Sequence, residues 1–311
     1  MFKFMWFLSI IWIFFAFLLI MATIFGFFAK YHWFFALFSH FRVQYFFATI
    51  IFLLIPEFFE KNIYIFYIQI LLLIAFVSNL FLIYPYLKFS KSKNKIKADL
   101  KVMFINIYMN NLKLKKITDY IIKIHPDIIG IAEYCTEHQE IMKTLVPFYK
   151  NSFGICKYKS GFGFAFFSKY KFKEFYRGGD EHMPFSIFEI FHPKQNFYVG
   201  VFHPNPPIGP KRFKKFIKQI SELEIVTKEN IIVMGDFNAS PWCYYFRKFL
   251  KTTNLKDPRK IFGLNFSWLR FTPFSLPIDH ILASKNFKYL NFKIDKHLGS
   301  DHRPVIAEIS F

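Results

Sequence analysis

The pattern of apolar and polar positions divides the chain into two unlike parts. Near its start, residues 5–29 and 63–87 form two stretches without a charged side chain, each long enough to cross a bilayer as a helix. Neither stretch has the short apolar core and the small-residue cleavage site of a signal peptide. We predict that both are transmembrane helices.

A third apolar stretch, residues 41–59, gives a weaker signal. Its run YFFATIIFLLI is short for a span, and it follows the aromatic and basic segment KYHWFFALFSHFR. Such a segment is typical of a helix in the membrane interface, where Lys30 and Arg42 would reach lipid headgroups. We favour three spans over a hairpin of two, which gives a membrane domain over residues 1–88.

A basic linker, residues 89–98, follows, and it contains all but the first residue of the run KFSKSKNKIK at 88–97. It is either a solvated connection or a cluster that rests against anionic headgroups. The positive-inside rule favours a cytoplasmic position for this linker and for the chain that follows it.

From residue 99 to residue 311, short apolar runs alternate with amphipathic stretches. Period-two or continuous apolar runs predict strands, and a period of 3.6 predicts helices. The mixture predicts one α/β domain of packed sheets and helices. The predicted strands are 99–107, 127–133, 161–168, 185–191, 197–203, 230–236, 278–284 and 303–311, and the predicted helices are 113–124, 211–228 and 242–251.

Composition agrees with a membrane part and adds a strong positive charge. Hydrophobic residues make up 54% of the chain, which is rare in a soluble domain. Lys and Arg number 41 against 21 Asp and Glu, a net charge of +20 that suits both anionic lipid and nucleic acid. The 3 Cys form no CxxC pair, which argues against a disulfide framework or a Cys-based zinc site.

Polar residues of catalytic type stand where the predicted strands end or begin. If those strands lie side by side, their polar ends share one rim of a sheet, which is a rigid platform for a site. Alone, each residue has a simpler explanation as a turn, a cap or a packed loop residue, but together they fit one active site. The candidates are Asn106, Glu133, His203, Asp236, Asn238, Asp279, Asp301 and His302.

These residue types allow a narrow chemistry. Glu133, Asp301 and Asn106 offer hard oxygen ligands of the kind that hold Mg²⁺, with Mn²⁺ as an alternative. The sequence has no HExxH motif that would favour zinc. His302, if it lies beside Asp279, is a base held in one orientation.

The run Gly235-Asp236-Phe237-Asn238 supplies a second pair of polar groups. Asp236 can accept a proton from an attacking water, and Asn238 can donate to a phosphoryl oxygen without adding a repelling charge. A metal ion with such donors is the expected apparatus for cleaving a phosphoester.

The whole set, with GDFN and SDH as its most telling motifs, resembles the endonuclease/exonuclease/phosphatase superfamily over residues 99–311. The resemblance implies a four-layer sandwich of two β-sheets between helices. It also implies roles. Glu133 would ligate the metal with Asn106 and Asp301 near it, and Asp236 and Asn238 would orient water and phosphate. His302 paired with Asp279 would be the base or a phosphate contact, and His203 would act on the leaving group or the phosphate.

The predicted spans and the run HPNPP at 203–207 make the chain similar to a membrane-anchored bacterial branch. That branch includes teicoplanin-resistance-type proteins, which are thought to act on lipid pyrophosphates. We therefore expect a multi-pass protein of a bacterial inner or plasma membrane that hydrolyses a phosphorylated lipid or lipid headgroup with Mg²⁺. A membrane-bound nuclease is the alternative, and a catalytically inactive scaffold is a third reading.

Overall fold

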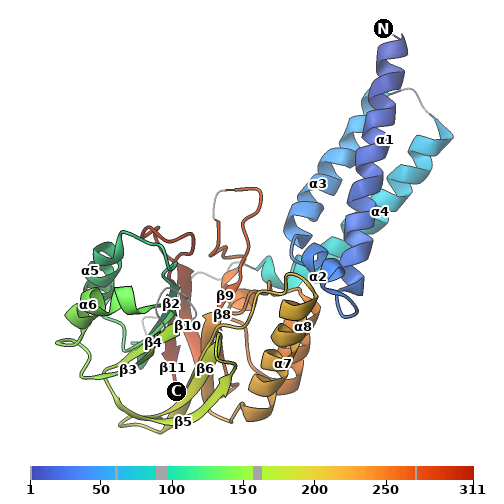
Figure 1. Ribbon diagram of the computed structural model, residues 1–311. Helices are drawn as coiled ribbons and strands as arrows, with labels where there is room; N and C mark the ends of the chain where they lie inside the picture. Colours follow the sequence, from blue (N-terminus) through green and yellow to red (C-terminus); the bar gives the residue numbers. More distant parts are fainter. Residues whose placement is uncertain (1, 60–61, 89–96, 157–162, 270–271) are drawn as a thin grey trace.

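The computed structural model describes residues 2–59, 62–88, 97–156, 163–269 and 272–311. Figure 1 shows a bundle of long helices from the N-terminal part and, beside one end of this bundle, a domain of sheets and helices. Most of the predicted basic linker, residues 89–96, lies outside the described residues.

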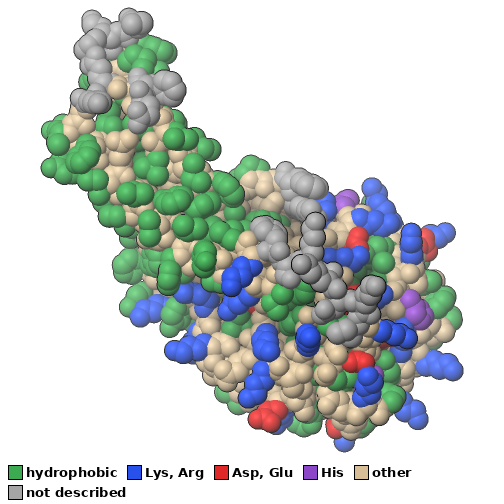
Figure 2. Space-filling model, turned by 180° about the vertical axis from the view of Figure 1, so that it is seen from behind, with side chains coloured by type: hydrophobic (Ala, Val, Ile, Leu, Met, Phe, Trp, Pro, Cys, Tyr) green, Lys and Arg blue, Asp and Glu red, His purple; other side chains and the backbone are tan. Residues whose placement is uncertain are grey.

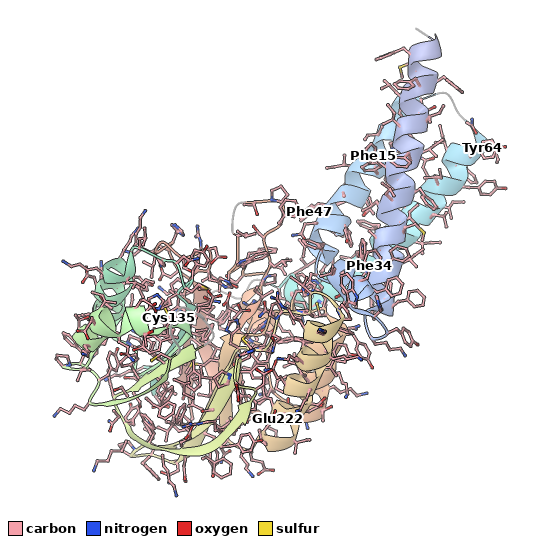
Figure 3. The ribbon with its side chains drawn as sticks, viewed as in Figure 1. Phe15, Phe34, Phe47, Tyr64, Cys135 and Glu222 are labelled. Carbon is pink, nitrogen blue, oxygen red and sulfur yellow. The ribbon has the colours of Figure 1, made fainter. Side chains whose placement is uncertain are left out.

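Three helices, α1, α3 and α4, lie side by side in the bundle (Figure 1). By length and composition, Phe4–Phe28 and Ile63–Tyr86 could each cross a membrane, in agreement with the two stretches predicted as spans. Large apolar side chains project outward from them, among them Phe15 and Tyr64 (Figure 3), and such a surface indicates membrane association. The helices are α1 (Phe2–Phe25), α3 (Arg42–Leu54) and α4 (Ile63–Ile83).

The third predicted stretch begins at a bend. Helix α2 (Trp33–Ser39) and α3 meet at 65°, and they amount to a span only if the bent pair is counted as one. The 13 residues of α3 extend about 20 Å, which is less than the roughly 30 Å of a hydrocarbon core. The structure is therefore compatible with two or three spans, and three remains a prediction.

Arg42 does not reach the lipid headgroups, contrary to the sequence-based expectation. Its side chain is buried inside the bundle, where Nη1 donates to the carbonyl oxygen of Thr23 at 2.8 Å and to Oδ1 of Asn79 at 3.2 Å. The guanidinium also lies 4.3 Å from the centre of the Phe27 ring. A cation among apolar helices needs such internal partners, and this requirement outweighs the pull toward the interface.

The domain consists of two packed mixed sheets with helices on their outer faces, which confirms the predicted fold class. The first sheet has the strand order β10-β11-β1-β2-β4-β3, and the second has the order β5-β6-β7-β8-β9. The strands are β1 (Leu100–Asn106), β2 (Ile128–Tyr134), β3 (Asn151–Ile155), β4 (Gly163–Ser168), β5 (Lys171–Gly179), β6 (Pro184–Phe191), β7 (Phe197–Phe202), β8 (Ile231–Asp236), β9 (Asp279–Ala283), β10 (Lys288–Ile294) and β11 (Val305–Ser310).

Helices cover the outside of each sheet. The helix α5 packs its buried face on the first sheet, and α7 and α8 pack on the second (Figure 1). The inner faces of both sheets share one apolar core. The helices of the domain are α5 (Leu114–Ile124), α6 (Gln139–Met142), α7 (Pro210–Val226), α8 (Tyr244–Thr253) and α9 (Arg259–Phe262).

The central strands are buried on both faces. In β1, Val102 and Phe104 point into the core between the sheets, while Met103 and Ile105 point toward α5. A strand covered on both faces is a continuous apolar run, which explains why the central strands were predictable. Within the described residues, every strand and helix predicted beyond residue 98 occurs, with ends within two residues of those predicted; positions 161–162 of the predicted strand 161–168 lie outside the described residues.

The bundle contacts the domain through α2 and its flanks. The Lys30 carbonyl oxygen accepts a hydrogen bond of 2.9 Å from Oη of Tyr245, and the His40 carbonyl oxygen accepts one of 2.7 Å from Nε1 of Trp242. Ala36 packs in the same apolar cluster as α7 and α8. The segment expected in the interface is thus seated directly on the domain.

Candidate active site

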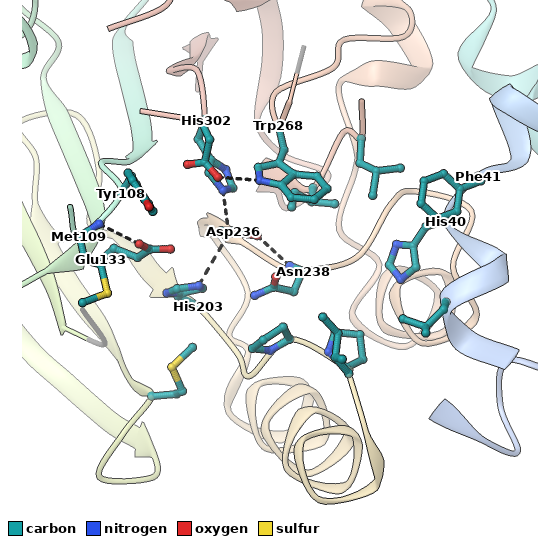
Figure 4. Close-up of a pocket in the computed structure, with 18 residues that line it drawn as sticks. His40, Phe41, Tyr108, Met109, Glu133, His203, Asp236, Asn238, Trp268 and His302 are labelled. Carbon is teal, nitrogen blue, oxygen red and sulfur yellow. Dashed lines mark hydrogen bonds and ion pairs between the residues drawn. The ribbon is translucent and has the colours of Figure 1, made fainter. Parts of the chain in front are cut away.

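The eight candidate residues meet at one rim of the sandwich. The parallel strands β1 and β2 end side by side, with Asn106 last in β1 and Glu133 next to last in β2, and β8 of the opposite sheet ends nearby in Asp236. Antiparallel pairing places Asp279, at the start of β9, opposite Asp236. Strand ends from both sheets therefore deliver side chains to one place, as Figure 4 shows.

Asn106 ties the two sheets together at this rim. Its Nδ2 donates to Oε1 of Glu133 at 2.9 Å and to Oδ2 of Asp236 at 3.1 Å. Its Oδ1 accepts from the Tyr108 amide at 3.0 Å. Because Asn106 is completely buried, these bonds fix the spacing between the two carboxylates.

Glu133 occupies a strained position. Its φ is 57°, in the left-handed region, at an irregularity in the pairing of β2 with β4. This conformation turns the carboxylate toward the rim, where Oε2 accepts from the Met109 amide at 2.9 Å. A non-glycine residue held this way is frequent at functional sites, where the surrounding structure maintains the strain.

The first position of the GDFN motif, residue 235, must be glycine for a steric reason. A Cβ at this position would lie 1.8 Å from the Phe202 carbonyl oxygen, so only glycine lets β7 and β8 approach this closely. The close approach brings His203, which follows β7, to Asp236: Nε2 of His203 lies 3.7 Å from Oδ2 of Asp236. His203 Nδ1 is buried without a hydrogen-bond partner among the described residues.

His302 and Asp279 form a buried pair. Nδ1 of His302 lies 2.8 and 3.0 Å from the two oxygens of Asp279, and Asp279 is inaccessible to solvent. Ser300 Oγ accepts from the His302 amide and donates to the Asn106 carbonyl oxygen. The His302 ring is therefore held in one orientation, with Nε2 3.7 Å from Oδ2 of Asp236.

The electrostatics suit acid–base chemistry. Burial raises the pKa of Asp236 to about 6, although the neighbouring imidazoles act in the opposite direction. Burial alone would lower the pKa of His302, but the charges of Asp279 and Asp236 raise it to about 10. At neutral pH this geometry favours an ionised Asp236 beside a protonated His302. Such a His302 can donate a proton or a hydrogen bond to a phosphoryl oxygen.

Asn238 lies in the bend that follows β8. Its φ is 48°, its amide donates to Oδ1 of Asp236 at 2.9 Å, and its Nδ2 donates to the Pro204 carbonyl oxygen at 3.0 Å. An amide group carries two hydrogens, so one remains for a substrate oxygen.

Two groups of residues could hold a divalent cation. Ligand atoms of Asp236, Asp279 and His302 lie within 4.8 Å of one another, but both Asp279 oxygens already contact the His302 ring. The sequence-predicted group is Glu133, Asp301 and Asn106. Glu133 and Asp301 line the same pocket, whereas Asn106 lies behind it and turns its Nδ2 toward Glu133. Oxygen donors of this kind fit a hard divalent cation.

The candidate residues lie at the polar end of a pocket of about 450 Å³. His203, Asp236, Asn238, Asp301, His302 and Glu133 all line it, whereas Asn106 and Asp279 lie behind them. Most of the remaining lining is apolar and comes from three places: Leu37, His40 and Phe41 at the end of α2, Pro206 to Ile208 after β7, and Trp268, Leu276 and Ile278 before β9.

Several lining residues were not identified from the sequence. The sequence pattern assigned no role to His40, Trp268, Tyr108 or Met109, all of which line the pocket. Trp268 donates from Nε1 to Oδ2 of Asp301 at 2.9 Å, which orients that carboxylate. The run HPNPP was the available signal for the apolar wall, since two of its prolines line the pocket.

Two packed sheets with carboxylates, an amide and imidazoles at one rim are typical of enzymes that hydrolyse phosphoester bonds. The sequence model of the endonuclease/exonuclease/phosphatase family matches residues 103–302, and the chain belongs to that family. Enzymes of this family depend on a divalent metal ion. A comparison with curated protein sequences found no match.

Solved structures support the fold. An endonuclease/exonuclease/phosphatase from Beutenbergia cavernae has 15% identity and a TM-score of 0.56, over 69% of this chain and 72% of that one. A mannosyl-6-phosphatase from Bacteroides thetaiotaomicron has 22% identity and a TM-score of 0.52, over 68% and 100%. TDP2 from D. rerio, complexed with a single-strand DNA product, has 14% identity and a TM-score of 0.54, over 68% and 99%.

Proposed function

We propose that this protein is a membrane-anchored, Mg²⁺-dependent phosphoesterase that hydrolyses a phosphorylated lipid. The observation that carries the proposal is the composition of the pocket. Its polar end holds the candidate catalytic residues, and its apolar wall includes Leu37 and Phe41 from the segment that joins α2 to α3. A lipid phosphoester has the same two-part character, with a charged group linked to an apolar chain.

The pocket wall is tied to the membrane bundle. The ring of Phe274, in the loop before β9, lies 6.4 Å from the ring of Phe41, and Nε2 of Gln44 donates to the Ser275 carbonyl oxygen at 2.8 Å. Figure 2 shows apolar side chains over the bundle and blue Lys and Arg side chains over the domain beside it. This arrangement suits an enzyme that rests on a lipid surface while its bundle sits in the bilayer.

The proposed roles follow from the contacts. Glu133, with Asp301 and Asn106 near it, would hold Mg²⁺, with Mn²⁺ as an alternative, and the cation would stabilise negative charge on the phosphoryl oxygens. Asp236 accepts a proton from the attacking water, because its carboxylate is ionised above a pKa of about 6. Asn106 fixes the distance between these two carboxylates.

Three further residues act on the phosphate. Protonated His302, held by Asp279, donates to a phosphoryl oxygen. His203 contacts the phosphate or the leaving group from the other side of Asp236. Asn238 donates its second amide hydrogen to the phosphate.

The test is hydrolysis by the full-length protein in detergent micelles or vesicles. The substrates are a polyprenyl pyrophosphate, a phosphatidylinositol phosphate, a phosphodiester lipid and plasmid DNA, each with Mg²⁺ and with EDTA. The proposal expects Mg²⁺-dependent turnover of at least one lipid, lost in Asp236→Asn. Absence of turnover of all three lipids would refute the proposed substrate class.

A nuclease is the second candidate. The net charge of +20 would attract a nucleic-acid backbone, and the D. rerio neighbour was solved with a DNA product. Cleavage of DNA that falls steeply with salt, with inert lipids, would favour this candidate. The apolar wall of the pocket favours a lipid substrate instead, because a phosphodiester backbone has little apolar surface to bury against it.

The side of the membrane remains a prediction. Three spans and the positive-inside rule favour a cytoplasmic domain in a bacterial inner or plasma membrane. A reporter that is active only in the cytoplasm should therefore be active when it is fused after Phe311.

A further inference from the structure

His40 is a pocket residue from outside the region that matches the family. It follows α2, whereas the family model begins at residue 103. Its ring lines the same pocket as Asp236 and Asn238. Figure 4 shows it between Phe41 and Asn238, where the apolar wall meets the polar end.

The structure holds the His40 ring in place. Its backbone oxygen accepts a hydrogen bond from Trp242, and its Nδ1 lies 3.4 Å from Sγ of Cys243. The residue is 8% exposed, and its Nε2 makes no hydrogen bond to another described residue. A ring nitrogen that has no hydrogen-bond partner among the described residues, on a side chain that lines a pocket, is available to bind a ligand.

Cys243 is the polar neighbour of Nδ1 on the His40 ring. Its sulfur lies 3.1 Å from Oγ of Ser240 and 3.2 Å from Oγ of Ser39. Burial would raise the pKa of this thiol, but His40 and the two hydroxyl groups lower it to about 7. When Nδ1 accepts a hydrogen bond from the thiol, the neutral ring carries its hydrogen on Nε2, which is then a donor.

We propose that His40 is a substrate-binding residue supplied by the membrane segment, and that its Nε2 donates a hydrogen bond to an oxygen of the lipid-linked part of the substrate. Cys243 is a positioning residue that orients the ring. The proposal rests on the proposed lipid phosphoesterase function. It assigns the membrane segment a part in substrate recognition in addition to anchoring.

The experiment compares a lipid with a small soluble substrate. Full-length wild type, His40→Ala and His40→Gln are assayed on vesicles with polyprenyl pyrophosphate or phosphatidylinositol phosphate, and on bis(p-nitrophenyl) phosphate. His40→Ala should lower kcat/KM for the lipid about tenfold or more, mainly through KM, because a hydrogen bond to a charged group is lost. The soluble substrate, which does not reach the wall, should change less than twofold. His40→Gln, which keeps a donor, should recover part of the loss.

Two controls separate binding from folding. His32→Asn retains a capping acceptor at the start of α2, where His32 Nδ1 accepts from the Phe34 amide, and it should match the wild type. Cys243→Ala should raise the lipid KM about threefold, because the ring loses its partner. Melting temperatures identify any variant that is misfolded.

The outcomes distinguish this proposal from the function on which it rests. If the wild type hydrolyses only the soluble substrate, the lipid function and this proposal both fail. If the wild type hydrolyses lipid and His40→Ala is unchanged, or falls equally on both substrates, only the role of His40 is overturned.

Discussion

The two ends of the pocket differ in origin and in chemistry. The polar end is built from strand ends within residues 103–302, the region that matches the family, and its side chains are fixed by hydrogen bonds between the two sheets. The apolar wall comes partly from residues 37–41 and is fixed by contacts with the membrane bundle. Under the proposed function, the family domain supplies the reaction and part of the wall, and residues 37–41 contribute to the choice of substrate. Variants at the two ends should therefore have separable effects.

The largest effect is expected at the polar end. Asp236→Asn removes the proton acceptor, so kcat should fall about a thousandfold for lipid and soluble substrates alike. Folding should not suffer, because burial already disfavours the charged form of this carboxyl. Activity assays with a melting curve check both parts. A fall confined to the lipid would contradict the division between the two ends.

Glu133→Gln should be next in size. Loss of the carboxylate charge weakens the proposed cation site, so the Mg²⁺ concentration for half-maximal activity should rise at least about tenfold. Glu140→Gln is the matched control, because Glu140 is an exposed residue on α6. Magnesium titration of both variants is the measurement. An unchanged midpoint in Glu133→Gln would mean that another group holds the cation.

The pH profile follows from the two shifted groups. Below pH 6, kcat/KM should fall about tenfold per unit as Asp236 takes up a proton, since its pKa is raised to about 6. Toward pH 10 it should fall again as His302 loses its proton. The acid limb should be the same for lipid and soluble substrates. A flat profile between pH 5 and 7 would exclude Asp236 as the base.

The smallest effect is expected at the apolar wall. Ile208 lines the pocket and is 55% exposed, so Ile208→Ser should cost little stability but raise the lipid KM by up to about tenfold. Ile225→Ser, on α7 and 84% exposed, does not line the pocket and is the control. Soluble substrate kinetics should stay level in both. If Ile208→Ser and Ile225→Ser have equal kinetics on lipid, the wall does not contribute to substrate binding.

The sequence was informative where strands are central and less so at the edges of the sheets. Three strands were not predicted: β3, β5 and β10. All three are edge strands, and along β5 half-buried residues alternate with exposed ones. Such strands bury too little surface to leave a continuous apolar run.

The same contrast holds for the site. The eight strand-end residues could be identified because strand order brings them to one rim, and six of them line the pocket. His40 and Trp268 could not, because their place depends on how distant segments pack. Arg42 was misjudged for a related reason: its partners Thr23 and Asn79 lie on other helices, and no local pattern reveals that contact.

The central claim is that one pocket joins phosphoester chemistry to a membrane lipid. The most direct measurement is release of phosphate or a phosphorylated headgroup from lipid vesicles by the full-length protein, with plasmid DNA assayed in parallel. The account predicts Mg²⁺-dependent lipid turnover that disappears in Asp236→Asn and exceeds DNA cleavage. Efficient DNA cleavage with no lipid turnover would contradict it.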